Sequence, residues 1–121
     1  MNILVCNVED IMMTAIKFRL EKHNFTMVAS PDGEAAVKSI EAGEADFVIV
    51  GTDVKKMPAP KVIQYVRRSL NSNLPFIVVA NQEEGEEILE YLKIGANDFV
   101  LRPFKPMELV LRIKRILENH N

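Results

Sequence analysis

Four short apolar runs are each followed by residues that would line a reaction site if the runs were strands of one sheet. The runs cover residues 3–6, 47–50, 76–79 and 99–101. In an open parallel sheet, ligands bind outside the carboxyl ends of the strands. The residues at those positions are, in chain order, Asn7 with Val8, Gly51, Ala80 and Arg102. They include one cation and no carboxylate, thiol or imidazole, the groups that act as acids, bases or nucleophiles.

Three carboxylates lie close to these positions without occupying them. Asp53 closely follows the second run, and Glu9 and Asp10 closely follow the first. We predict that Asp10 caps the next helix and that Glu9 lies near its exposed first turn. Arg102 has two interpretations: it anchors an anion or a partner, or it forms an ion pair with Glu9 or Asp53. We favour the ion pair, because no acidic cluster is apparent nearby.

The strands that would position these residues alternate with segments of helical periodicity, five times at roughly even spacing. This alternation indicates βαβ units and an α/β fold with a parallel sheet. A short, partly polar strand at 26–29 suits a sheet edge. In the acidic helix expected at 83–94, we predict that Ile88, Leu89 and Leu92 face inward and that Gly95 ends the helix. The other helices are expected at 11–23, after the turn at 30–34, across 62–70 and from 106 onward.

The composition is typical of one soluble globular domain covering residues 1–121. The net charge is −2, and the Lys and Arg residues form no clear cluster that could contact phosphates. We therefore predict no nucleic-acid binding through this domain. The single cysteine, Cys6, lies within an apolar run, where a buried thiol in a reducing compartment is expected. No signal peptide or membrane-length apolar segment is apparent, so we predict a cytoplasmic protein without membrane contact.

Several segments, in order and spacing, resemble the receiver domains of two-component response regulators, the CheY-like family. The most specific is Arg102-Pro103-Phe104, where the family has Lys-Pro-Phe. The resemblance covers essentially the whole chain and implies a three-layer α/β/α sandwich with a five-stranded parallel sheet in the order 2-1-3-4-5. The other supporting segments are Asn2-Ile3-Leu4-Val5, Pro31-Asp32-Gly33-Glu34-Ala35, Ala45-Asp46-Phe47-Val48-Ile49-Val50, Leu74-Pro75-Phe76-Ile77, Gly95-Ala96-Asn97-Asp98-Phe99 and Glu108-Leu109.

The resemblance implies a phosphorylation site that this chain has largely lost. Active receivers phosphorylate an aspartate after the third strand, using an acidic pair that holds Mg²⁺, a Ser or Thr, and a Lys. We therefore interpret the chain as a pseudo-receiver that is not an enzyme and needs no cofactor. Phe99, at the position of the family's switch aromatic, is expected to be a core residue. By this resemblance, the acidic pair corresponds to Asn7 and Val8, and the acceptor aspartate corresponds to Gly51. The hydroxyl position corresponds to Ala80, and the lysine position corresponds to Arg102.

Two alternatives stay open from the sequence. The run Asp53-Val54-Lys55-Lys56-Met57-Pro58 resembles the family's Asp-x-x-Met-Pro with one residue inserted, which would make Asp53 the acceptor in a rearranged Mg²⁺ site. A gap-free alignment places Gly51 there instead. A small flavodoxin-like enzyme is the other alternative, although residues 7–10 lack the Gly, Ser and Thr donors that would hold a phosphate.

The resemblance also implies a protein partner, such as a histidine kinase or an output domain. In many receivers, the face made by the fourth helix, fifth strand and fifth helix forms dimers or docks a partner. A homodimer with ion pairs across a two-fold axis is one interpretation of this surface, and a merely solvated face is the other. The acidic and basic residues concerned are Glu86, Glu87, Glu90, Asp98, Lys93, Arg112 and Arg115.

Overall fold

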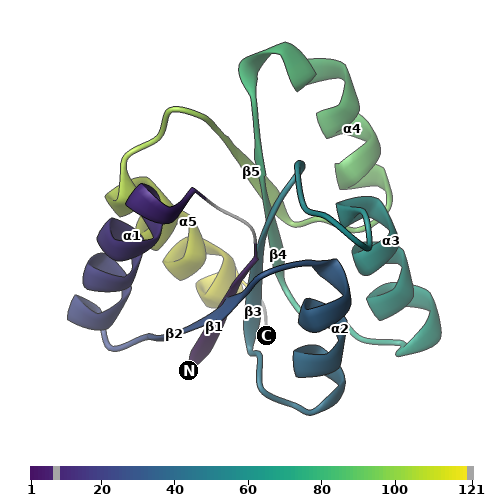
Figure 1. Ribbon diagram of the computed structural model, residues 1–121, viewed down its shortest axis with the longest axis horizontal. Coiled ribbons are helices and arrows are strands. Elements are labelled where there is room, and N and C mark those ends of the chain that lie inside the picture. Colours follow the sequence, from purple (N-terminus) through teal and green to yellow (C-terminus); the bar gives the residue numbers. More distant parts are fainter. Residues whose placement is uncertain (7–8, 120–121) are drawn as a thin grey trace.

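Five parallel strands form the centre of the protein in the order β2-β1-β3-β4-β5. The computed structural model describes residues 1–6 and 9–119. It confirms the α/β fold and the strand order expected from the resemblance (Figure 1). The strands are β1 (Asn2–Cys6), β2 (Thr26–Ser30), β3 (Phe47–Gly51), β4 (Phe76–Ala80) and β5 (Asp98–Leu101).

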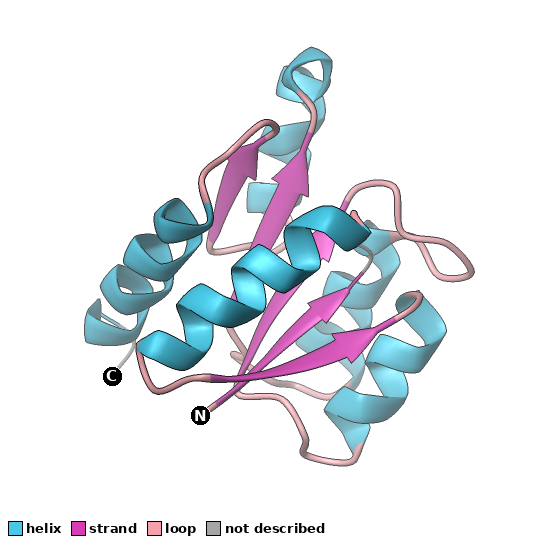
Figure 2. Ribbon diagram, turned by 60° about the vertical axis from the view of Figure 1, so that its left-hand side comes forward, coloured by secondary structure: helices cyan, strands magenta, loops and turns pink. Residues whose placement is uncertain are grey.

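Helices cover both faces of the sheet, which gives the three-layer sandwich. α1 and α5 pack on one face, and α2, α3 and α4 pack on the other (Figures 1 and 2). Two short irregular helices join this set: η1 has π-helical geometry, and η2 is a 3₁₀ turn. The bounds are α1 (Asp10–Lys22), α2 (Gly33–Glu41), α3 (Ala59–Gln64), η1 (Tyr65–Ser69), η2 (Gln82–Glu84), α4 (Gly85–Lys93) and α5 (Pro106–Asn119).

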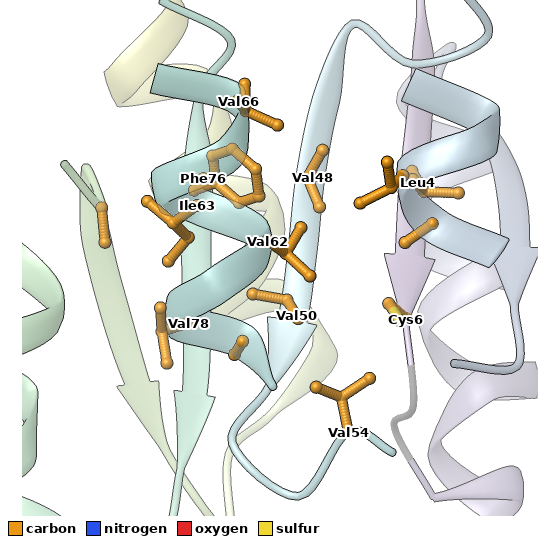
Figure 3. Close-up of a cluster of buried hydrophobic side chains, with 14 of the residues drawn as sticks. Leu4, Cys6, Val48, Val50, Val54, Val62, Ile63, Val66, Phe76 and Val78 are labelled. Atoms are coloured by element: carbon orange, nitrogen blue, oxygen red, sulfur yellow. The ribbon is translucent and has the colours of Figure 1, made fainter. Parts of the chain in front are cut away.

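The apolar strands contribute side chains to two separate hydrophobic cores, because successive side chains of a strand point to opposite faces of the sheet. Val48 and Val50 of β3 pack under α2 and α3, in the cluster drawn in Figure 3. Phe47 and Ile49 point the other way, into the cluster under α1 and α5. All five residues of β3 and all five of β4 are buried. Burial on both faces explains why these two strands are continuous apolar runs.

The structure corrects three expectations about the helices. Asp10 is the first residue of α1, and Glu9 precedes the helix without a side-chain capping bond. Leu89 is 61% exposed and Leu92 is 37% exposed, whereas Tyr91 is only 8% exposed. With Ile88 facing inward, the helical period brings the residue three positions on, Tyr91, to the same face, and turns Leu89 outward. The expected helix across 62–70 divides into α3 and η1.

None of the helices that the structure describes is long and apolar enough to cross a membrane.

Candidate functional site

The carboxyl ends of β3, β4 and β5 lie side by side at one edge of the sheet. Gly51, the last residue of β3, pairs with Val79, and Ala80, the last residue of β4, pairs with Leu101. Both Gly51 and Ala80 are buried. The other two positions expected here, Asn7 and Val8, lie outside the described residues. Strand pairing thus brings the two smallest residues of the expected site together, and neither offers a functional side chain.

Arg102 follows β5 and places a cation at this edge of the sheet. Its Nη2 donates to Asp53 Oδ1 over 3.2 Å, and its Nη1 donates to Asn81 Oδ1 over 3.3 Å. The Arg102 side chain is 14% exposed and that of Asp53 is 58% exposed. The ion pair expected from the sequence therefore forms with Asp53. Arg102 also lines, with Glu9, a small cavity of about 100 Å³, well below the size that holds a small-molecule ligand.

A second set of contacts, centred on Glu84, was not anticipated from the sequence. Glu84 Oε1 accepts a hydrogen bond from the Thr52 hydroxyl at 2.8 Å and one from the Asn81 backbone N–H at 2.7 Å. The Asn81 contact belongs to a capping box that starts the η2 turn. An Asn followed three residues later by Glu is a recognisable sequence signal for that box. The contact with Thr52 carries no such local signal, because it joins residues 32 positions apart.

These contacts join the three loops that follow β3, β4 and β5. Glu84 connects the β4–α4 loop to Thr52, and Arg102 connects the β5–α5 loop to Asp53 and Asn81. We call these five residues, Thr52, Asp53, Asn81, Glu84 and Arg102, the loop network. Its carboxylates accept from its own hydroxyl, amide and guanidinium groups, so the loops are held together by the chain's own polar groups.

The donor set at this edge does not suit a divalent cation. Mg²⁺ requires near-octahedral oxygen coordination, commonly with one or two carboxylates. Here one oxygen of Asp53 faces the Arg102 guanidinium, and one oxygen of Glu84 already accepts two hydrogen bonds. Among residues 1–6 and 9–119, no three His, Cys, Asp or Glu side chains are grouped closely enough to hold a metal.

Two further residues singled out from the sequence have structural roles. Phe99 is half-buried and packs against the core under α2, α3 and α4. Cys6 is buried, and burial raises the pKa of its thiol to about 11. Only the thiolate is a good nucleophile, so this thiol is unreactive near neutral pH.

Comparison with known proteins decides the family. A family model described as the response regulator receiver domain matches residues 3–114. The chain belongs to the response regulator receiver domain family. Among solved structures, the receiver domain of the Francisella response regulator 1452 superposes with a TM-score of 0.88 at 22% identity, covering 99% of this chain and 98% of that chain. A putative response regulator from Chloroflexus aurantiacus has a TM-score of 0.87 at 24% identity, covering 97% of each chain. At these identities, the two structures support the shared fold.

Curated relatives of this receiver domain are longer regulators. The alkaline phosphatase synthesis transcriptional regulatory protein PhoP of Bacillus subtilis is 29% identical over 115 residues, which are 95% of this chain and 48% of that protein. The response regulator GtcR of Aneurinibacillus migulanus is 31% identical over 113 residues, which are 93% of this chain and 46% of that protein. The chain spans about half the length of the curated relatives it matches. It is therefore a receiver domain of the two-component response regulator type.

Proposed function

We propose that this receiver domain does not accept a phosphoryl group, catalyses no reaction and signals through contacts with other proteins. The observation that carries the proposal is Gly51 at the end of β3, where the family presents its acceptor aspartate. Glycine has no side chain to phosphorylate. Ala80 likewise lacks a hydroxyl at the end of β4, so a phosphoryl group would have no side-chain donor there.

The charge pairing within the loop network also supports this proposal. In an active site of this kind, a cation pairs with the phosphoryl group, and metal ligands hold Mg²⁺. Here the guanidinium of Arg102 is already compensated by Asp53 at 3.2 Å. The three loops are joined without a phosphoryl group or a metal, so we infer that the domain holds one arrangement until a partner changes it.

The alternative function, a working receiver that uses Asp53, rests on one observation. The Asp53 carboxylate is 58% exposed and lies beside Arg102, the only residue at these strand ends that retains the charge of the family's position. Asp53 lies two residues beyond the end of β3, however, and no hydroxyl follows β4. We therefore favour the pseudo-receiver over a receiver that is phosphorylated at Asp53.

Incubation with Mg²⁺ and acetyl phosphate should leave the mass of the protein unchanged. A phosphoaspartate would add about 80 Da, which intact-mass spectrometry resolves easily in a chain of 13.7 kDa. Beryllofluoride with Mg²⁺ should likewise leave the amide NMR spectrum of residues 51–53 and 80–84 unchanged. A Mg²⁺-dependent mass gain that disappears in Asp53→Ala would overturn the proposal and establish the alternative. Asp46→Ala provides the control for loss of an aspartate elsewhere.

A second copy of this chain is the partner that we propose for the α4–β5–α5 face. Helices α4 and α5 expose three leucines, Leu89, Leu92 and Leu111, on an otherwise charged surface. Arg112 of α5 contacts Asp98 of β5 at 2.9 Å and Glu108 at 3.2 Å. The charges on this face are of both signs, acidic on α4 and basic on α5, which suits a self-complementary interface.

Leu111→Glu should raise the dissociation constant of this dimer by about tenfold, because it places an unpaired charge in the interface. Sedimentation equilibrium over a range of concentrations measures the effect. Ile11→Glu is the matched control, since Ile11 is also an exposed aliphatic residue (86% exposed) but lies on α1, across the sheet from α4. A monomer at all concentrations, or equal weakening by the two variants, would contradict this assignment of the face.

A further inference from the structure

A pocket of about 260 Å³ lies between α3 and α4, and its lining includes none of the loop-network residues. Pro60 and Gln64 of α3 form one wall; Glu87, Glu90 and Tyr91 of α4 form the other, and Ile94 also lines the pocket. Both helices lie on the same face of the sheet (Figure 1). The volume lies just below the range of pockets that bury a drug-sized ligand, and it suits a single long side chain.

Tyr91 is the buried polar residue of this pocket. It is 8% exposed, and its hydroxyl makes no hydrogen bond to any residue that the structure describes. No side-chain oxygen or nitrogen among those residues is both fully buried and without a partner. The Tyr91 hydroxyl therefore reaches the surface of the pocket with its hydrogen-bonding capacity unused. At the pocket surface the hydroxyl is accessible, so it can form a hydrogen bond with water or with a polar group of a ligand.

The charge around the pocket is strongly negative. Residues 82–93 carry five glutamates and one lysine, and two of these glutamates, Glu87 and Glu90, line the pocket. Glu90 makes a surface contact of 3.4 Å with Lys93, and both side chains are more than 70% exposed. Burial and the carboxylates of Glu84 and Glu87 raise the pKa of the Tyr91 hydroxyl. The pocket thus combines a neutral hydroxyl and apolar walls with two carboxylates.

We propose that the α3–α4 pocket binds an arginine or lysine side chain presented by a protein partner. Such side chains bury an aliphatic stem against apolar surface while the charged end stays near water. Pro60, Ile94 and the Tyr91 ring would contact the stem. The Tyr91 hydroxyl would accept a hydrogen bond from the charged end, and Glu87 and Glu90 would pair with its charge. This pocket adjoins the α4–β5–α5 face, because Glu87 and Glu90 of α4 belong to both. It is independent of the phosphoacceptor question, because it uses none of the loop-network residues.

Titration with an acetylated and amidated Gly-Arg-Gly tripeptide tests the proposal by amide chemical shifts. We expect shifts confined to residues 60–64 and 87–94, with a dissociation constant on the order of 1 mM. The same peptide with citrulline in place of arginine keeps the size and planar shape of the side chain, but it lacks the charge and has a carbonyl oxygen in place of one nitrogen. It should bind at least about threefold more weakly.

Three variants separate a specific pocket from general attraction to an acidic helix. Glu87→Gln should weaken arginine-peptide binding by about threefold, whereas Glu86→Gln removes the same charge outside the pocket lining and should leave it unchanged. Tyr91→Phe keeps the ring in the core and removes only the hydroxyl, so it should weaken binding without lowering the melting temperature. Equal effects of Glu86→Gln and Glu87→Gln, equal binding of the citrulline peptide, or shifts absent from the pocket would each overturn the proposal.

Discussion

Gly33→Ala should lower the free energy of unfolding by about 3 kcal/mol, because a methyl group at this position has no space. Gly33 is the first residue of α2, and its N–H donates to the Lys55 carbonyl oxygen at 3.0 Å. A β-carbon at Gly33 would overlap the Met57 carbonyl oxygen and lie 2.8 Å from the Met57 β-carbon. Backbone atoms cannot turn away as a flexible side chain can, so the whole β3–α3 loop would have to move.

The matched control is Gly85→Ala at the first residue of α4. Gly85 has helical angles (φ −56°, ψ −36°), and no atom lies within 4 Å of a β-carbon built there. Alanine at such a position should raise the free energy of unfolding by about 0.5–1 kcal/mol, since it restricts the unfolded chain. Urea denaturation of both variants gives the comparison. Equal stability of Gly33→Ala and the parent protein would mean that the β3–α3 loop is not tightly packed on α2.

Arg67→Ala should also cost about 3 kcal/mol, because Arg67 of η1 fixes the turn between α4 and β5. Its Nη2 and Nε donate to the Gly95 carbonyl oxygen at 2.8 and 3.2 Å, and its Nη1 donates to the Ser72 carbonyl oxygen at 2.9 Å. Its Cζ lies 5.3 Å from the centre of the Phe76 ring. Alanine would leave these part-buried carbonyl groups without their charged donor and remove the contact with the ring.

Arg68→Ala is the control for Arg67→Ala. Arg68 is the next residue in the same helix and is exposed, so its loss should change the free energy of unfolding by less than about 0.5 kcal/mol. Arg67→Lys should recover only part of the loss, because an ammonium group cannot reproduce the planar set of donors. Equal effects of Arg67→Ala and Arg68→Ala in urea denaturation would show that the contacts with Gly95 and Ser72 contribute little.

The central strands could be predicted from the sequence because strands that are buried on both faces have continuous apolar sequences. Residues 47–50 and 76–79 are apolar without interruption, as strands covered on both faces must be. The observed strands are each one residue longer, because Gly51 and Ala80 continue the parallel ladder. The order of the strands came from the family resemblance, since an apolar run does not specify its neighbour.

The details of the site could not be predicted to the same extent, because they depend on contacts between distant residues. Glu9 and Asp53 are both carboxylates near Arg102 in the expected sheet, and only the folded loops show that Asp53 pairs with it. The bond between Thr52 and Glu84 joins two loops with no shared motif. Leucine is more apolar than tyrosine, so the sequence pattern favours Leu89 as an inward-facing residue, yet Tyr91 is buried and Leu89 is exposed. Tyr91 also lines the α3–α4 pocket.

The loop network also determines how readily phosphoryl transfer, which we propose that this domain has lost, could be regained by substitution. An aspartate placed at Gly51 would enter an edge where the donors of Thr52 and Asn81 are already bonded to Glu84, and where Arg102 is already paired. Recovery would require the release of Glu84, a hydroxyl after β4 and a set of metal ligands, in addition to the new acceptor. A variant with only some of these substitutions would lose contacts of the loop network without gaining phosphoryl transfer. Reversion, in nature or in the laboratory, is therefore a path of several coordinated changes.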